Sequence, residues 1–251
     1  MSTLAELRAV GSAAKQLPSA LLRRGCQSLH AVAERNSRYP VLLIHGYAGS
    51  ESVWAPARQA LSDAGFGHIV SLNYNSFATD PVDVSAEVAR LAHEALRTTG
   101  APRVHLVGHS LGGLIVRHAL STDAELTDRT CTAVTIASPH RGAPLARIAP
   151  GRCARIMHPR GSSLHSHAAT MRRVRWLAYY SDGDRVVPTT SARLDDLRYG
   201  ATNLLIPGCG HLTICRDARL IRSLVNELIR TETSSAPAAQ AAAAAFLPVA
   251  A

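Results

Sequence analysis

Residues 104–113 read VHLVGHSLGG, and this stretch decides the fold. Its first residues are the apolar run of a buried strand, and the residues after it, LIVRHAL at 114–120, are typical of a helix. Between them Gly-x-Ser-x-Gly centres on Ser110, and glycine at 108 and 112 permits a tight strand-to-helix turn that raises the serine side chain out of the sheet. Ser110 would then lie at a helix N-terminus, where free N–H groups favour a developing negative charge. The pattern predicts a nucleophile; a glycine-rich turn with a capping serine is the alternative.

Length and composition indicate one globular α/β domain. The chain has 251 residues, of which 47% are hydrophobic and 4% aromatic, and no apolar run is long enough to span a membrane. Residues 1–33 lack the apolar core of a signal peptide, so we expect a cytoplasmic protein, with non-standard export left open. Five cysteines are an odd number and favour reduced thiols, although a Cys209–Cys215 disulfide stays open.

The charge balance is strongly basic. The formal net charge is +9, and Lys15 is the only lysine, so arginine supplies almost all of the positive charge. Such a balance is compatible with nucleic acid, an anionic membrane surface or an acidic substrate as partner, or with codon usage alone. A non-catalytic basic module that binds membrane or nucleic acid is therefore kept as a remote alternative, although no nucleic-acid motif is present and no nucleic-acid partner is expected.

Apolar strand patterns alternate with helical patterns along the chain. Strands are expected over 40–44, 68–72, 104–107, 131–137, 174–180 and 203–206, and helices over 53–64, 83–98, 114–120 and 218–230. This alternation predicts an α/β fold with a mostly parallel, doubly wound sheet over 38–231. We expect residues 1–37 to form an N-terminal helical extension and residues 232–251 to be a disordered, alanine-rich tail.

Reactive side chains follow several of the expected strands. Ser110, Asp184, His211 and the His45–Gly46 loop each come just after one, and ligands bind beyond the carboxyl ends of parallel strands. A serine hydroxyl needs a base to take its proton, neutral imidazole suits that role, and a carboxylate stabilises the imidazolium that forms. The chain order serine, aspartate, histidine is the order that one α/β architecture uses.

These stretches carry a resemblance to the α/β-hydrolase fold, and within it to small bacterial triacylglycerol lipases and esterases. The similarity covers about residues 39–230 and rests on VLLIHGY (41–47), GHSLGG (108–113), YSDGDRVVP (180–188), GCGH (208–211) and, more loosely, SPHRG (138–142). It implies Ser110 as nucleophile, Asp184 as acid and His211 as base, with the backbone N–H groups of Tyr47 and Leu111 as oxyanion hole. It implies no cofactor.

Some side chains compete for these roles. Asp182 lies two residues before Asp184, but the pattern of the family that the chain resembles, with an aliphatic pair and a proline just after the acid, favours Asp184. His109 is next to Ser110 and cannot easily reach its hydroxyl across the turn, and His118 lies on the following helix, so His211 is the expected base. His45 is expected to support the oxyanion loop by hydrogen bonding.

The segment 143–172 is expected to be irregular and to form a short cap or lid beside the site, as the resemblance implies. Residues 140–167 contain metal-capable side chains, but their spacing matches no zinc pattern, and no metal is expected: His140, Cys153, His158, His165 and His167. No acidic residue occurs between Asp128 and Asp182, whereas arginines recur throughout that interval. A basic cap would draw the protein to anionic lipid surfaces or anionic esters; a solvated arginine-rich loop is the alternative.

The predicted function is a serine carboxylic-ester hydrolase, a lipase or esterase that works through an acyl-enzyme on Ser110. The substrate is expected to be a small ester or a lipid. An acyltransferase or a thioesterase would use the same three residues and stays open, as does an amide hydrolase. The sequence makes no prediction about oligomeric state or acyl chain length.

Overall fold

The computed structural model describes residues 38–158, 171 and 173–244, with side chains described up to residue 234. The expected strand residues fold into short strands of four to seven residues. They are β1 Val41–Ile44, β2 Ile69–Leu72, β3 Val104–His109, β4 Thr130–Ile136, β5 Arg175–Tyr180 and β6 Thr202–Leu205. Strands β1, β3 and β4 are buried along their whole length, as expected for apolar runs covered on both faces of a sheet.

The strands described by the structure form one parallel sheet in the order β2-β1-β3-β4-β5-β6. All five neighbouring pairs are parallel, so the carboxyl ends of the strands lie at one edge. The chain runs outward from β1 to β2 and then returns to the other side of β1 for β3. The strand order therefore reverses between β1 and β3, and the loops after these two strands flank the crevice where such sheets bind ligands.

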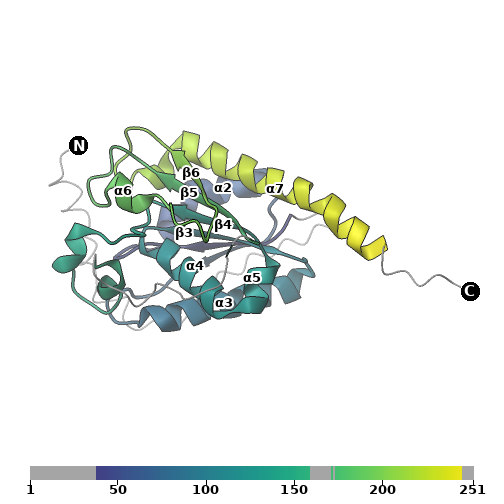
Figure 1. Ribbon diagram of the computed structural model, residues 1–251, viewed down its shortest axis with the longest axis horizontal. Helices are drawn as coiled ribbons and strands as arrows, with labels where there is room; N and C mark the ends of the chain where they lie inside the picture. Colours follow the sequence, from purple (N-terminus) through teal and green to yellow (C-terminus); the bar gives the residue numbers. More distant parts are fainter. Residues whose placement is uncertain (1–37, 159–170, 172, 245–251) are drawn as a thin grey trace, which may run out of the picture.

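Helices cover both faces of the sheet (Figure 1). Figure 1 shows α2 and α7 on one face and α3, α4 and α5 on the other. Their bounds are α2 Ala55–Asp63, α3 Pro81–Thr99, α4 Leu111–Thr122, α5 Ala124–Arg129, α6 Thr189–Ala192 and α7 Ala218–Ala244. Short 3₁₀ turns lie at η2 Glu51–Trp54, η3 Pro144–Arg147, η4 Cys153–Met157 and η5 Ile214–Arg216. The predicted doubly wound α/β architecture is confirmed.

Two hydrophobic clusters fill the two faces. One joins β1, β3 and β4 to α3 and α4 and includes Ile115, Trp176 and, from the segment expected as a cap, Met157. The other joins the opposite face of the sheet to α2 and α7 and includes Trp54 and Leu224. Since successive strand side chains point to opposite faces, alternate apolar residues of one strand feed both clusters. The sheet thus becomes a rigid support for the loops at its carboxyl edge.

The structure corrects the expected boundary of the C-terminal tail. Helix α7 continues to Ala244, beyond the residue where disorder was predicted to begin. Glu232, predicted as the first tail residue, accepts hydrogen bonds from the Tyr39 N–H at 2.8 Å, from Arg38 at 3.2 Å and from His105 at 3.1 Å. Alanine has the highest helix propensity, so an alanine-rich segment extends a helix that is already anchored, and composition alone misplaced this boundary.

The other expected segments are tested only in part. The N-terminal extension over 1–37 and the residues after Ala244 lie outside the described residues, as do 159–170 and 172 of the expected cap. The described part of that segment is not wholly irregular, because it forms η3 and η4. Within the residues the structure describes, no helix is long and apolar enough to cross a bilayer.

Candidate active site

Ser110 lies at the turn between β3 and α4 in a strained backbone conformation. Its φ is 53° and its ψ is −120°, values that cost a non-glycine residue about 1–3 kcal/mol. The surrounding structure fixes this geometry, because the Ser110 N–H donates to the carbonyl of Ile136 at 2.8 Å and the Ser110 carbonyl accepts from the Gly113 N–H at 3.1 Å. The hydroxyl is thereby held beyond the end of β3, as the motif predicted.

The glycines around Ser110 are required by close packing of backbone on backbone. A Cβ at Gly108 would lie 2.4 Å from the carbonyl group of Gly112, and a Cβ at Gly112 would lie 2.2 Å from the carbonyl oxygen of Ile44. Such distances are far inside van der Waals contact, and the obstructing atoms are main chain that cannot rotate away. The tight turn therefore presses α4 against the ends of β1 and β3.

Ser110, His211 and Asp184 form a continuous hydrogen-bonded chain. The Oγ of Ser110 lies 2.9 Å from Nε2 of His211, and Nδ1 of His211 lies 2.7 Å from Oδ2 of Asp184. A carboxylate only accepts, so Nδ1 donates and Nε2 is left to accept from the serine hydroxyl. The three residues come from the loops after β3, β5 and β6, and all are buried, with 4–8% of each exposed.

Asp184 is the aspartate that reaches His211, and Asp182 is not. Burial raises the pKa of the Asp184 carboxyl, but the His211 imidazole and the N–H groups of Val186 and Val187 outweigh burial and lower that pKa below its ordinary value. Asp182 instead accepts from the Gly208 N–H at 2.7 Å, which ties together the loops that carry Asp184 and His211. The carboxylate beside His211 is therefore held in its charged form.

His45 holds the loop after β1, as the sequence predicted. Its Nδ1 donates to the Gly46 carbonyl at 2.8 Å, so its Nε2 accepts from the Tyr74 N–H at 3.3 Å. The Tyr74 ring stacks on the imidazole at 4.3 Å, and burial lowers the pKa of His45. Ser76, which sequence reasoning missed, accepts from the Ala48 N–H at 2.9 Å and fixes the same loop from outside.

Tyr47 and Leu111 lie on either side of the serine. Tyr47 follows Gly46, where an added Cβ would lie 2.9 Å from Cβ of Ser110, so this loop passes directly beside the hydroxyl. No described residue accepts from the Tyr47 N–H. Leu111 is the first residue of α4, where the N–H has no carbonyl one turn earlier in the helix. Both N–H groups are thus available to an acceptor beside Ser110.

His109 supports the site rather than competing for its base. Its Nε2 donates to the carbonyl of His211 at 3.0 Å, and the two rings lie 5.0 Å apart. Burial, with the nearby His211, lowers the pKa of His109 to about 3, so this imidazole is neutral. Sequence reasoning set His109 aside as a base but missed this contact, because nothing local links residues 102 positions apart. His118 lies on α4, and within the described residues no hydrogen bond joins its ring to Ser110.

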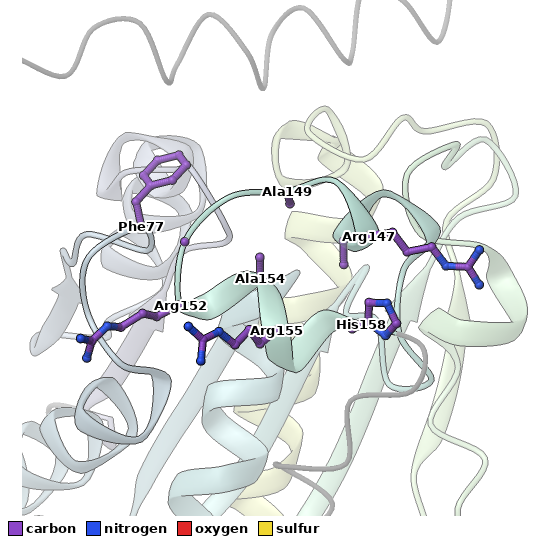
Figure 2. Close-up of a pocket in the computed structure, with 9 residues that line it drawn as sticks. Phe77, Arg147, Ala149, Arg152, Ala154, Arg155 and His158 are labelled. Carbon is purple, nitrogen blue, oxygen red and sulfur yellow. The ribbon is translucent and has the colours of Figure 1, made fainter.

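A cavity of about 550 Å³ opens at the described part of the cap (Figure 2). We call residues 144–158 the cap segment; it contains η3 and η4. Figure 2 shows the labelled lining residues Phe77, Arg147, Ala149, Arg152, Ala154, Arg155 and His158. The cap segment contacts the loop after β1 because the Tyr47 hydroxyl donates to the carbonyl of Pro150.

Two of the metal-capable side chains, His140 and Cys153, make other contacts. His140 is buried between Arg117, which donates to its Nδ1 at 3.1 Å, and Thr135, 3.1 Å from its Nε2. Cys153 donates to the carbonyl of Thr79 at 3.4 Å. Among the described residues no group of three histidine, cysteine or acidic side chains could hold a metal ion, and His165 and His167 lie outside them.

The described cysteines are free thiols. They are Cys131, Cys153, Cys209 and Cys215, so the Cys209–Cys215 pair that the sequence left open is not bridged. Cys209 donates instead to a carboxylate oxygen of Asp217 at 3.1 Å. The loop that carries His211 is therefore not closed by a disulfide between these two cysteines.

Residues 39–157 match the model of the alpha/beta hydrolase fold. In sequence, the chain is 31% identical over 118 residues to a triacylglycerol lipase of Pseudarthrobacter phenanthrenivorans, a match covering 44% of this chain and 36% of that one. It is 33% identical over 127 residues to a triacylglycerol lipase of Pseudomonas fragi, covering 47% of this chain and 42% of the relative. The matches thus span less than half the length of these relatives.

Solved structures extend the likeness beyond the matched region. The mature form of a Bacillus licheniformis lipase superposes with a TM-score of 0.66 and 16% identity, covering 80% of this chain and 96% of that one. At such low identity the superposition shows a common fold, and its coverage is larger than that of the sequence matches. The chain resembles bacterial triacylglycerol lipases in sequence and has the α/β-hydrolase fold.

Proposed function

We propose that the protein is a carboxylic-ester hydrolase that acts through Ser110, His211 and Asp184. The observation that carries the proposal is the unbroken hydrogen-bond chain among these three side chains, at 2.9 and 2.7 Å. The sequence matches to triacylglycerol lipases favour an ester of a fatty acid as substrate. A binding module would have no need to hold a serine in a strained conformation against a base.

The proposed reaction begins with attack of the Ser110 hydroxyl on the ester carbonyl. His211 takes the hydroxyl proton at Nε2, and the charged Asp184 stabilises the imidazolium and fixes its orientation. The backbone N–H groups of Tyr47 and Leu111 would stabilise the oxyanion, and each such donor is worth about 3–4 kcal/mol in the transition state.

Collapse of the tetrahedral intermediate would then break the bond to the alcohol. His211 returns its proton to the leaving alkoxide, which departs as the alcohol and leaves an ester of the acid on Ser110. His211 next takes a proton from a water molecule, the resulting hydroxide attacks the acyl-enzyme, and Ser110 recovers its proton as the acid departs. Apart from the ester and one water molecule, the steps use only side chains and backbone groups of this chain.

The decisive experiment compares wild type with Ser110→Ala on p-nitrophenyl esters of increasing acyl length. We expect hydrolysis by wild type and a fall of at least about 1,000-fold in the variant, since the nucleophile is lost. Ser234→Ala, a matched change on the exposed surface of α7, should keep full activity. A wild type that cleaves no ester and whose Ser110 is not labelled by a fluorophosphonate would refute the proposal.

We also propose that the arginine-rich interval between Asp128 and Asp182 attracts the protein to anionic lipid surfaces. The whole interval contains no acidic residue. Basic side chains gain about 1 kcal/mol each near an anionic membrane, and the gain decreases as salt is added. Sedimentation with anionic and neutral vesicles at low and high salt tests this; equal binding to both would contradict it.

A further inference from the structure

The cavity at the cap segment is large enough to hold part of a small molecule. Its volume of about 550 Å³ lies within the range of about 300–1,000 Å³ that is common for ligand pockets. One wall is Phe77, from the loop after β2, and the other walls come from η3, η4 and the residues between them. The cavity is therefore built where two segments distant in sequence meet.

Arginine side chains dominate the charge of this cavity. Arg147, Arg152 and Arg155 all line it, and no carboxylate does among the described residues. None of the three forms an ion pair within the described part of the chain, although Arg90, Arg173, Arg193 and several other arginines do. Figure 2 shows Arg152 and Arg155 towards one end of the cavity and Arg147 towards the other. Three like charges repel one another, and an anion between them would relieve that repulsion.

One carboxylate acts on the cap segment electrostatically: burial raises the pKa of the Cys153 thiol, and the charge of Asp80 raises it further. The Asp80 carboxylate already accepts from the Val82 N–H at 3.0 Å, as the N-cap of α3. It is not among the cavity residues, and the cap segment supplies no acid of its own. One such carboxylate cannot neutralise three guanidinium groups.

Apart from His158, the rest of the lining is apolar, so the cavity combines a charged part with a hydrocarbon part. Phe77, Ala146, Ala149 and Ala154 supply hydrocarbon surface between the arginines. Ile148 does not line the cavity, but it lies between two lining residues in the sequence, and its side chain is 81% exposed. Guanidinium groups match phosphate oxygens in geometry, and the hydrocarbon surface suits a short aliphatic or glycerol portion. The combination fits an amphiphile with a phosphate group.

Direct contacts link the cavity to the loop beside Ser110. The Tyr47 hydroxyl donates to Pro150 of the cap segment, and the Tyr47 ring packs edge-on against Phe77 at 5.0 Å. The Arg152 N–H donates to the Phe77 carbonyl at 3.2 Å, so the main chain of the cap segment is attached to the loop after β2 at this point. Because Tyr47 follows the glycine that packs against Ser110, this one residue connects the loop beside the serine to the wall of the cavity.

We propose that this cavity binds the phosphate of the substrate itself, so that the preferred substrate is a single-chain acyl ester carrying a phosphate group. The inference rests on the proposed hydrolase function and specifies its substrate class. Arg152 and Arg155 bind the phosphate, Arg147 adds charge from the other end, and Phe77 packs against the adjacent carbon atoms. The substrate is thereby recognised as a monomer, independently of any lipid surface.

A binding measurement tests the cavity without requiring catalysis. Hexyl phosphate is titrated into the Ser110→Ala protein by calorimetry, with inorganic phosphate and hexanol in parallel. We expect hexyl phosphate to bind more tightly than either, and Arg152→Gln or Arg155→Gln to weaken it about tenfold, the effect of losing one charge-assisted hydrogen bond. Arg222→Gln removes an equal charge from the exposed surface of α7 and should leave binding unchanged.

The outcomes separate this inference from the proposed function. No binding of hexyl phosphate, or equal weakening by Arg222→Gln, overturns the cavity inference whether or not esters are cleaved. If the wild type cleaves no ester but hexyl phosphate binds in a manner that depends on Arg152, the proposed hydrolase function is refuted and the phosphate site in the cavity is supported. Arg152→Lys, which keeps the charge but not the forked geometry, should restore part of the affinity.

A kinetic measurement then distinguishes a monomeric substrate from a lipid surface. Hydrolysis of 1-hexanoylglycerol 3-phosphate and of 1-hexanoylglycerol is compared below the concentrations at which either aggregates. We expect a higher kcat/KM for the phosphate ester, and a fall of about tenfold in the ratio of the two values in Arg155→Gln. A preference that appears only on anionic vesicles, and not with monomers, would overturn the cavity inference in favour of surface attraction.

Discussion

The imidazole of His211 is fixed through three separate groups. Asp184 accepts from its Nδ1, Ser110 lies at its Nε2, and His109 donates to its backbone carbonyl. The first two contacts set the orientation of the ring. The third fixes the position of the His211 main chain, from which the ring extends. His109 is thus a positioning residue, because it acts through His211 and does not face a substrate.

We expect His109→Phe to lower kcat for p-nitrophenyl esters by about 10- to 100-fold while KM changes little. The variant keeps a ring of similar size but leaves the buried His211 carbonyl without its donor, which costs about 1–3 kcal/mol. Steady-state kinetics on a soluble ester measures the split between kcat and KM. A variant that loses only stability, with kcat unchanged in the folded fraction, would argue against positioning.

At the scale of elements, the turn from β3 to α4 depends on contacts between main-chain atoms. Gly112 packs against the end of β1, and Gly113 packs against Ser138 after β4, where a Cβ would lie 2.0 Å from the serine Oγ. The start of α4 therefore holds together the three strands whose ends surround Ser110. The glycines here are required by space as well as by backbone freedom.

Gly112→Ala should destabilise the protein by more than about 3 kcal/mol, because the added methyl overlaps the carbonyl of Ile44 and the main chain must shift. Gly100→Ala is the matched control: no atom lies within 4 Å of its Cβ, and only its φ of 68° opposes alanine, at about 1 kcal/mol. Urea unfolding of both variants gives the comparison. Equal losses would show that space at Gly112 is not limiting.

Helix α7 is attached to the start of the sheet through Glu232. Its carboxylate accepts from Tyr39, Arg38 and His105, which precede or form the first residues of β1 and β3. We expect Glu232→Ala to destabilise the protein by about 2–3 kcal/mol, since it leaves the partly buried Tyr39 N–H and the buried His105 ring without their acceptor. Glu87→Ala, which breaks an exposed pair with Arg90, should cost less than about 1 kcal/mol by the same thermal or urea measurement.

For the whole molecule, buried histidines set the dependence of stability on pH. Burial lowers the pKa of His45, His105, His109 and His140, in His140 with help from the charge of Arg117. Their folded pKa values lie below the unfolded value of about 6.5, so the unfolded chain binds more protons in acid. Their stabilising contribution is therefore present above that pH and is lost as the pH falls below it.

Urea unfolding at pH 7.5 and 5.5 should accordingly give a lower midpoint at pH 5.5. Each buried neutral imidazole contributes a slope of up to about 1.4 kcal/mol per pH unit below its unfolded pKa. Because His109→Phe removes one of these groups, its stability should fall less steeply over the same interval. Stability that is constant from pH 7.5 to 5.5 would contradict the assignment of these histidines as neutral.

Much of the architecture follows from local pattern. Apolar runs placed the strands within one or two residues of their ends, and Gly-x-Ser-x-Gly placed Ser110 at the turn after β3. The candidate partners Asp184 and His211 were found because each follows a strand, and their meeting is a consequence of parallel topology. The end of the last helix was misplaced, because composition does not reveal that Glu232 is anchored to residues near position 39.

The sequence by itself determined the parallel α/β architecture and the identity of the three residues that meet at its carboxyl edge. Those features depend on periodicity and on short motifs, which act between near neighbours in the chain. Only the tertiary structure decided that His109 supports His211, that Tyr47 reaches Pro150 and that three arginines enclose a cavity. The first two contacts join residues about 100 positions apart, and the cavity forms where the cap segment meets Phe77. Their distances are fixed by packing of the whole chain, which no local pattern encodes.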